Sequence, residues 1–206
     1  GVSLVAPMFT LMIAFGDIFG LGGSSVISRL LGEKKDNEAK KTCAFCIWVS
    51  LVFGLCISAI LLLFRTQILG LLGVSKVTYE YANAYYTWIA IGAVSIIFSM
   101  VPSNILSTEG LAVQSMAGSI IGSIVNIIFD PIFIFGLNQG AAGAAMATVL
   151  GNIIADIYYV YAVIKKSKRL TCSPSHMKIT GRRVKDILMI SIDHKYHADL
   201  YDGHDK

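Results

Sequence analysis

The sequence predicts an all-α membrane protein, a bundle of five transmembrane helices followed by the start of another. Of the 206 residues, 55% are hydrophobic and only 15% are charged, whereas a soluble domain carries about 25% charged residues. The charged residues also gather in short clusters between long apolar stretches, which is typical of a chain that crosses a membrane several times. Together, these two observations exclude an ordinary water-soluble domain.

Five apolar segments are long enough to cross a bilayer as helices. A helix rises about 1.5 Å per residue, so about 20 apolar residues span a hydrocarbon core of about 30 Å. Residues 1–164 therefore form the predicted transmembrane bundle. Residues 65–78 connect the second and third segments, and we expect a short amphipathic turn there. The five segments cover residues 1–31, 42–64, 79–103, 111–135 and 141–164.

The basic residues of the loops predict the orientation of the bundle. The loop 32–41 carries four lysines and the basic loop 165–186 carries eight Lys or Arg, whereas 65–78 carries two and 136–140 carries none. Loops rich in Lys and Arg stay in the cytoplasm, so we place the two rich loops there. We expect a multi-pass protein of the cell membrane (the inner or plasma membrane) whose first segment enters from outside.

The two ends of the chain differ from this pattern. Residues 187–192 are apolar and read as the start of a further transmembrane segment, and residues 193–206 form an irregular polar tail. We expect a shifted or broken reading frame to account for the tail. The chain begins at Gly1 instead of Met, which indicates a truncated N-terminus.

The fourth segment carries the most informative polar residues. Gly118, Gly122, Asn126 and Asp130 recur every four residues and so share one helical face. Small residues let membrane helices approach closely, so this face should pack against other helices and point Asp130 into the bundle. Pro131 donates no amide hydrogen and should disturb the helix next to the acid.

Counting residues from the outer ends of three segments places four polar side chains at one level. We expect Asp130, Asn126, Thr148 and Tyr86 to lie together in the outer half of the bundle. An ionised carboxylate is costly there, so Asp130 should carry a proton or, with amide and hydroxyl oxygens beside it, coordinate Na⁺. The alternative is structural, in which Asn126 and Asp130 only link helices by hydrogen bonds.

Other candidate residues have less support. Asp17 lies in the first segment beside glycines, where it is either a second relay acid or the cap of a broken helix. Cys43 and Cys46 have metal-ligand spacing but no second pair, so we interpret them as packing residues. The sequence shows no clustered nucleophile, metal set or acid–base pair. We therefore expect no enzyme activity, no metal centre and no cofactor.

Four motifs stand out along the chain: Phe-Gly-Leu-Gly-Gly-Ser-Ser-Val-Ile-Ser-Arg-Leu-Leu-Gly at 19–32, Asn-Ile-Leu-Ser-Thr-Glu-Gly at 104–110, Asn-Ile-Ile-Phe-Asp-Pro-Ile-Phe-Ile-Phe-Gly at 126–136, and Gly-Ala-Ala-Gly-Ala-Ala-Met-Ala-Thr at 140–148. Together they resemble the multidrug and toxic-compound extrusion (MATE) family of antiporters, especially its prokaryotic DinF-like branch. The resemblance covers about residues 1–190. It implies helices 2–6 of a six-helix N-terminal lobe and the start of helix 7 of a two-lobe exporter.

The resemblance also implies a function. Family members export amphipathic organic cations in exchange for inward Na⁺ or H⁺, and Asp130 and Asn126 match an acid and an amide of the first-lobe cation site. Thr148 matches a threonine of that site, and Tyr86 matches a lobe tyrosine. The resemblance implies as partners a small-molecule drug or organic cation and the lipid bilayer, but no nucleic acid.

The chain departs from the family in three ways. It lacks the first helix, which supplies another site aspartate, it lacks the second lobe, and Ser107-Thr108 replaces the usual Arg before Glu-Gly. Because alternating access requires two halves, we expect this partial chain to be inactive alone. Two other functions remain open, a flippase for lipid-linked substrates from the same superfamily and a non-transporting membrane subunit.

Overall fold

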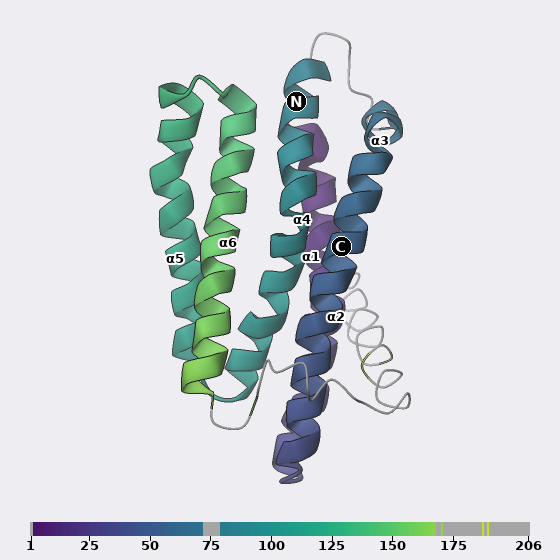
Figure 1. Cartoon of the computed structure of the whole chain (residues 1–206), viewed down its shortest axis with the longest axis vertical. Helices are drawn as coiled ribbons and strands as arrows, with labels where there is room; N and C mark the ends of the chain where they lie inside the picture. The colour runs from purple at the N-terminus through teal and green to yellow at the C-terminus, as the bar shows by residue number, and fades with distance from the viewer. Residues whose placement is uncertain (1, 72–78, 168–169, 171–186, 188, 190–206) are drawn as a thin grey trace, which may run out of the picture.

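The computed structural model describes residues 2–71 and 79–167, together with residues 170, 187 and 189. Five long helices form a single bundle in this part of the chain (Figure 1). A short helix follows α2, and a π-helical turn extends α5. The elements are α1 (Val2–Gly32), α2 (Asp36–Leu63), α3 (Arg65–Leu71), α4 (Tyr79–Thr108), α5 (Ala112–Pro131), η1 (Ile132–Gly136) and α6 (Gly140–Lys166).

The five long helices confirm the predicted transmembrane segments. Each is long and apolar enough to cross a membrane, with α1 counted from Met8 and α5 extended through Gly136. The expected short turn after the second segment is also present, as α3. The predicted further segment at 187–192 lies outside the described residues except for Ile187 and Met189, and the tail 193–206 lies wholly outside them.

Two predicted loops are shorter than the sequence suggested. We expected a loop over 32–41, but α2 begins at Asp36. Asp36 and Glu38 lie in the first turn of that helix, where carboxylates interact favourably with the positive end of the helix dipole. At the expected turn over 104–110, α4 instead continues to Thr108 and the chain reverses at Gly110, whose φ is +84°.

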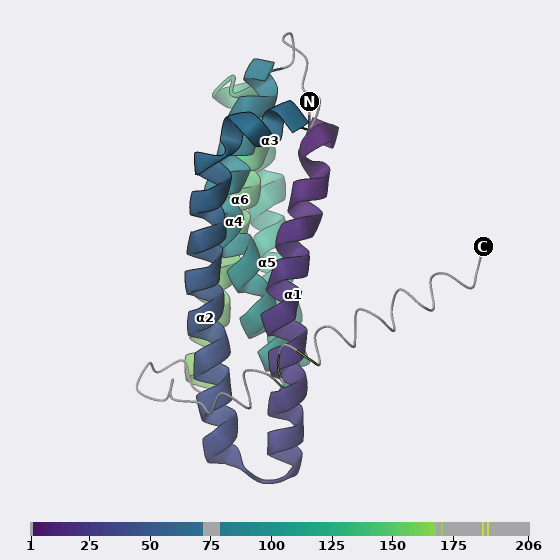
Figure 2. The same ribbon diagram turned by 90° about the vertical axis from the view of Figure 1, so that its right-hand side faces the viewer.

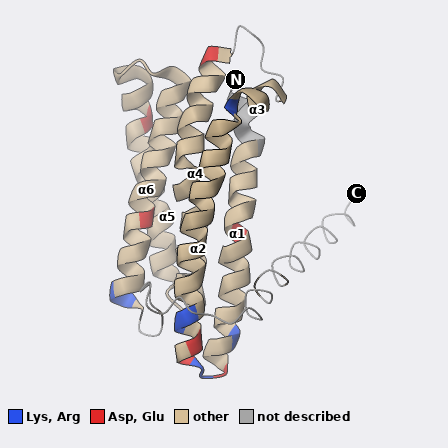
Figure 3. Cartoon of the chain, turned by 45° about the vertical axis from the view of Figure 1, so that its right-hand side comes forward, with Lys and Arg blue, Asp and Glu red and all other residues tan. Residues whose placement is uncertain are grey.

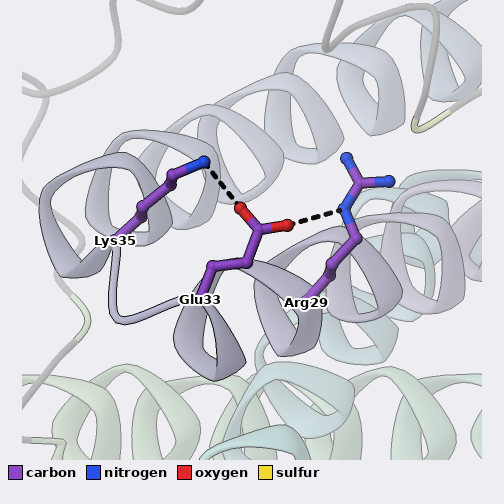
Figure 4. A network of polar contacts seen from close by, with 3 residues as sticks. All are labelled: Arg29, Glu33 and Lys35. Atoms are coloured by element: carbon purple, nitrogen blue, oxygen red, sulfur yellow. Dashed lines mark hydrogen bonds and ion pairs between the residues drawn. The ribbon is translucent and has the colours of Figure 1, made fainter.

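The short connection between α1 and α2 carries a surface ion network (Figure 4). Lys35 Nζ lies 2.7 Å from Glu33 Oε2, and Arg29 Nε lies 3.9 Å from Glu33 Oε1. The hydrogen bond and positive charge of Lys35, followed by the charge of Arg29, lower the pKa of Glu33. Because all three side chains are exposed to solvent, this network contributes little to stability.

Helix α4 forms the centre of the bundle. It packs along α1 and α2 on one side and along α6 on the other, and α5 packs mainly on α6. Figures 1 and 2 show this arrangement from two directions. Large side chains of α4, including Ile89, Ile96 and Ile97, are almost fully buried. α4 therefore holds the α1–α2 pair and the α5–α6 pair in one body.

Charge and hydrophobicity divide the surface as a membrane would require. Basic side chains gather where α1 joins α2 and where α6 ends (Figure 3). In contrast, α5 exposes a continuous set of large apolar side chains, which suits contact with lipid or with other transmembrane helices. The exposed members on this helix are Val113, Met116, Ile120, Ile124, Ile127 and Ile128.

Candidate functional site

Two glycines bring α5 and α6 into direct backbone contact. A Cβ atom on Gly151 would lie 2.6 Å from the carbonyl oxygen of Gly122, and one on Gly118 would lie 2.2 Å from the ring of Tyr159. Only glycine permits such an approach at these points. The prediction that the small face of the fourth segment packs against neighbouring helices is therefore confirmed, and this packing sets the height of the polar residues one turn further along.

Asn126 and Thr148 meet directly above this contact. The Asn126 amide nitrogen Nδ2 donates a hydrogen bond to Thr148 Oγ1 at 3.2 Å, and Thr148 Oγ1 donates to the Ala144 carbonyl at 3.0 Å. Asn152 Nδ2 in turn donates to the Thr148 carbonyl at 2.9 Å. Two of the four predicted site residues are thus in contact, Asn126 from α5 and Thr148 from α6.

The Asn126–Thr148 pair faces a cavity of about 460 Å³ between α4, α5 and α6. The cavity walls carry amides and hydroxyls from all three helices, and no Lys or Arg lines them. Its polar lining consists of Ser99, Ser119, Ser123, Asn126, Thr148, Asn152 and Tyr159. Oxygen atoms of these kinds suit a hard monovalent cation or ordered water. We call this space the α4–α5–α6 cavity.

A group of hydroxyls gathers at the end of the α4–α5–α6 cavity that Ser119 and Tyr159 line. Tyr159 OH lies 2.9 Å from Ser119 Oγ and donates to the Ser115 carbonyl at 3.3 Å. Ser115 Oγ lies 2.8 Å from Ser103 Oγ on α4. Ser115 and Ser119 belong to the small polar face of the fourth segment, but the sequence analysis assigned neither Tyr159 nor Asn152 to the site. The spacing of four from Thr148 to Asn152 was the available signal for Asn152, whereas nothing in the sequence pointed to Tyr159.

Asp130 lies one helical turn from Asn126 towards the end of α5, and it does not line the α4–α5–α6 cavity. Its Oδ1 atom is buried and has no hydrogen-bond partner among the described residues. The charge of Asp130 acts on Tyr85 of α4. Helix α5 changes to the π-helical turn η1 immediately after Pro131, which is the local disturbance that the proline led us to expect.

Tyr86 points away from the other three predicted residues. Its side chain is almost fully buried, and its hydroxyl donates to the Leu61 carbonyl of α2 at 2.7 Å. Its neighbour Tyr85, and not Tyr86, lies near enough to Asp130 for the two side chains to interact electrostatically. Adjacent residues of a helix point about 100° apart. Counting along the sequence gives the depth of Tyr86 in the membrane, but it does not give the rotation of the helix and so cannot tell which way the side chain points.

Asp17 lies on α1, at the boundary between α1 and α4. Gly16 and Gly20 on either side of it pack tightly against Met100 and Asn104 of α4, and the Asp17 side chain itself is half-buried. Within the described residues, no group of three or more His, Cys, Asp or Glu side chains could hold a metal ion. A cation site in this part of the chain would therefore include at most two such side chains and rely on neutral oxygens for the rest.

A family model described as MatE matches residues 1–132. The chain belongs to the MatE family. Among its MatE-family relatives, "Multidrug export protein MepA" of Staphylococcus haemolyticus (strain JCSC1435) is 35% identical over 191 residues, covering 93% of this chain and 42% of that protein. The protein of the same name from Staphylococcus saprophyticus is 30% identical over 189 residues, covering 92% of this chain and 42% of the relative.

Solved transporters share the fold of this MatE-family chain. A multidrug resistance MATE family transporter of the MOP superfamily, in an inward-facing conformation, matches with a TM-score of 0.87 at 30% identity, covering 93% of this chain and 44% of that one. A MOP superfamily transporter from Pyrococcus furiosus Vc1 (DSM3638) matches with a TM-score of 0.86 at 30% identity, covering 93% and 42%. The chain thus spans less than half of its relatives.

Proposed function

We propose that this MatE-family chain is part of a cation-coupled multidrug efflux antiporter that exports amphipathic organic cations. The observation that carries the proposal is the hydrogen bond from Asn126 to Thr148 in a polar cavity, one turn from Asp130, whose buried Oδ1 atom has no hydrogen-bond partner among the described residues. An uncompensated carboxylate inside a bundle is costly and marks an ion or proton pathway. Na⁺ or H⁺ is the proposed coupling ion, with no other cofactor.

The roles within the proposed site follow from the contacts. Asp130 takes up the coupling ion or proton, and the oxygens of Asn126 and Thr148 coordinate it or hold the water beside it. Tyr85 lies within electrostatic range of Asp130, so we assign the tyrosine of the proposed coupling site to Tyr85. Tyr86 takes a structural role instead, linking α4 to α2. We assign no direct coupling role to Asp17, because its neighbours fix it at the α1–α4 contact.

The relatives and the cavity support transport over the two alternatives. The proteins matched are described as multidrug export proteins and transporters, and none is described as an enzyme. A flippase for anionic lipid-linked substrates would require basic residues, whereas the α4–α5–α6 cavity lacks them. We place the protein in the inner or plasma membrane with its basic loops in the cytoplasm. It would work there together with the rest of a transporter whose full length is more than twice that of this chain.

The test is dye efflux from cells that carry the full-length transporter, driven separately by a Na⁺ gradient and by a pH gradient. We expect Asp130→Asn to reduce coupled efflux by about 100-fold, whereas the matched control Asp36→Asn, at the exposed start of α2, leaves it unchanged. Unchanged efflux in Asp130→Asn would remove that residue from coupling. Efflux by the 206-residue chain alone would contradict the need for a second lobe.

A further inference from the structure

A second cavity lies on a different face of the bundle. It occupies about 370 Å³ between α2, α4 and α6, and it shares no lining residue with the α4–α5–α6 cavity. Figure 1 shows α4 between α6 and α2, the three helices that supply its lining residues. Its walls are almost entirely apolar. The wall residues that matter below are Leu51, Ile91, Val94, Phe98 and Ile153. We call this space the α2–α4–α6 groove.

The groove opens towards the outside of the bundle. Ile91 and Ile153, on opposite walls, keep 45% and 43% of their surface exposed. In a membrane such an opening faces the hydrocarbon region, because both residues lie in the middle of apolar spanning helices. A molecule dissolved in the bilayer can therefore reach the groove without entering the bundle interior.

One acid, Asp156 of α6, lines this apolar groove. Ser95 Oγ of α4 donates a hydrogen bond to Asp156 Oδ2. The other oxygen, Oδ1, is buried without a hydrogen-bond partner among the described residues. The ion pairs described in this structure lie at the α1–α2 connection and the start of α2, and none reaches Asp156. Among the described residues, the structure therefore pairs Asp156 with a serine and with no basic side chain.

The position of Asp156 on its helix separates it from the coupling residues. Thr148, Asn152 and Tyr159 of α6 face the α4–α5–α6 cavity, whereas Val149, Ile153 and Asp156 face the groove. The spacing 149, 153 and 156 is that of one helical face. Asp156 is thus an intramembrane acid that the proposed coupling site does not use, and such residues are usually functional.

We propose that the α2–α4–α6 groove binds a lipophilic monovalent cation, an apolar body that carries one ammonium or phosphonium charge, with Asp156 as its counter-charge. Apolar walls with one convergent polar group and a volume above about 300 Å³ are the usual features of a small-molecule site. The positive charge of such a cation would balance the Asp156 carboxylate, and its apolar body would occupy the space between the apolar walls. The binding step stands by itself, and its use in loading compounds for export rests on the proposed function.

The experiment measures binding of radiolabelled tetraphenylphosphonium to the full 206-residue chain in lipid nanodiscs. We expect Asp156→Asn to weaken binding by about ten-fold or more, because the counter-charge is lost. The matched control Asp36→Asn, an exposed acid at the start of α2 and outside this groove, should change the affinity by no more than about two-fold. Equal binding by wild type and Asp156→Asn would overturn the proposal, as would a large loss in Asp36→Asn alone.

A second variant protects the result against misfolding. Ile153→Trp keeps Asp156 but fills the groove from its rim, so it should also abolish binding while helix content and size-exclusion profile stay as in the wild type. A neutral competitor that keeps three of the four phenyl groups, triphenylphosphine oxide, should displace the probe poorly. Equal displacement by this compound would identify the groove as a lipid crevice and refute the cation site. Efflux by the full-length Asp130→Asn transporter tests the proposed function separately.

Discussion

Gly122 of α5 and Gly151 of α6 touch backbone to backbone, and each would place a Cβ atom within 3.0 Å of the other's carbonyl oxygen. This contact allows Asn126, one turn beyond Gly122, to reach Thr148 across the interface. The Asn126–Thr148 hydrogen bond and the walls of the α4–α5–α6 cavity therefore depend on the short distance between α5 and α6, which is possible because Gly122 and Gly151 have no side chains.

Gly151→Val should separate the two helices. The added side chain would collide with backbone of α5, which cannot move aside as a flexible side chain can. We expect the free energy of unfolding to fall by about 1–3 kcal/mol, as in other overpacked cores. Thermal unfolding in detergent measures it, with Gly70→Ala as control, because nothing lies within 4 Å of the Cβ position there. Equal stability of the two variants would contradict the tight contact.

The Asn126–Thr148 hydrogen bond predicts a measurable coupling between the two residues. In a double-mutant cycle of Asn126→Ala and Thr148→Ala, we expect a coupling free energy of about 0.6 kcal/mol, the average for such pairs in membranes. Thr148→Ser retains the hydroxyl and should retain most of the coupling. Strictly additive effects would show that the side chains do not interact.

The five spans could be predicted from sequence because the signal is local. Runs of more than 20 apolar residues between charged clusters determine where helices cross the membrane, and the spacing of Gly118 and Gly122 gave the packed face of α5. Helix ends were less predictable. The polar residues 36–41 looked like a loop, but they form the first turns of α2, with acids in the first turn.

The candidate site could be predicted only in part, because it depends on the rotation of each helix. Asn126 and Thr148 meet as expected since glycine contacts fix both helices. Tyr86 and Tyr85 lie at the same depth, yet only the structure shows that Tyr86 bonds α2. The α2–α4–α6 groove was not foreseen, since it joins residues from three helices that no short motif connects.

Tyr86→Phe should separate the structural role of this residue from ion coupling. The variant loses the 2.7 Å hydrogen bond to the Leu61 carbonyl but retains the buried ring. We expect the free energy of unfolding to fall by about 1 kcal/mol, while the Na⁺ or pH dependence of efflux by the full-length transporter stays unchanged. Tyr85→Phe is the matched comparison, and it should alter the ion dependence because Tyr85 lies within electrostatic range of Asp130. The reverse pattern would return Tyr86 to the coupling site.

Tyr159→Phe should loosen the hydroxyl-lined end of the α4–α5–α6 cavity without changing the packing of the ring on Gly118. It removes the contacts to Ser119 Oγ at 2.9 Å and to the Ser115 carbonyl at 3.3 Å. We expect a loss of about 0.5–1.5 kcal/mol in the free energy of unfolding. Chemical denaturation in mild detergent measures this loss, with the adjacent Tyr158→Phe as a control that should stay within about 0.5 kcal/mol of the wild type. If both phenylalanine variants match the wild type, the Tyr159 hydroxyl does not hold α6 against α5, and the cavity end relies on the glycine contact alone.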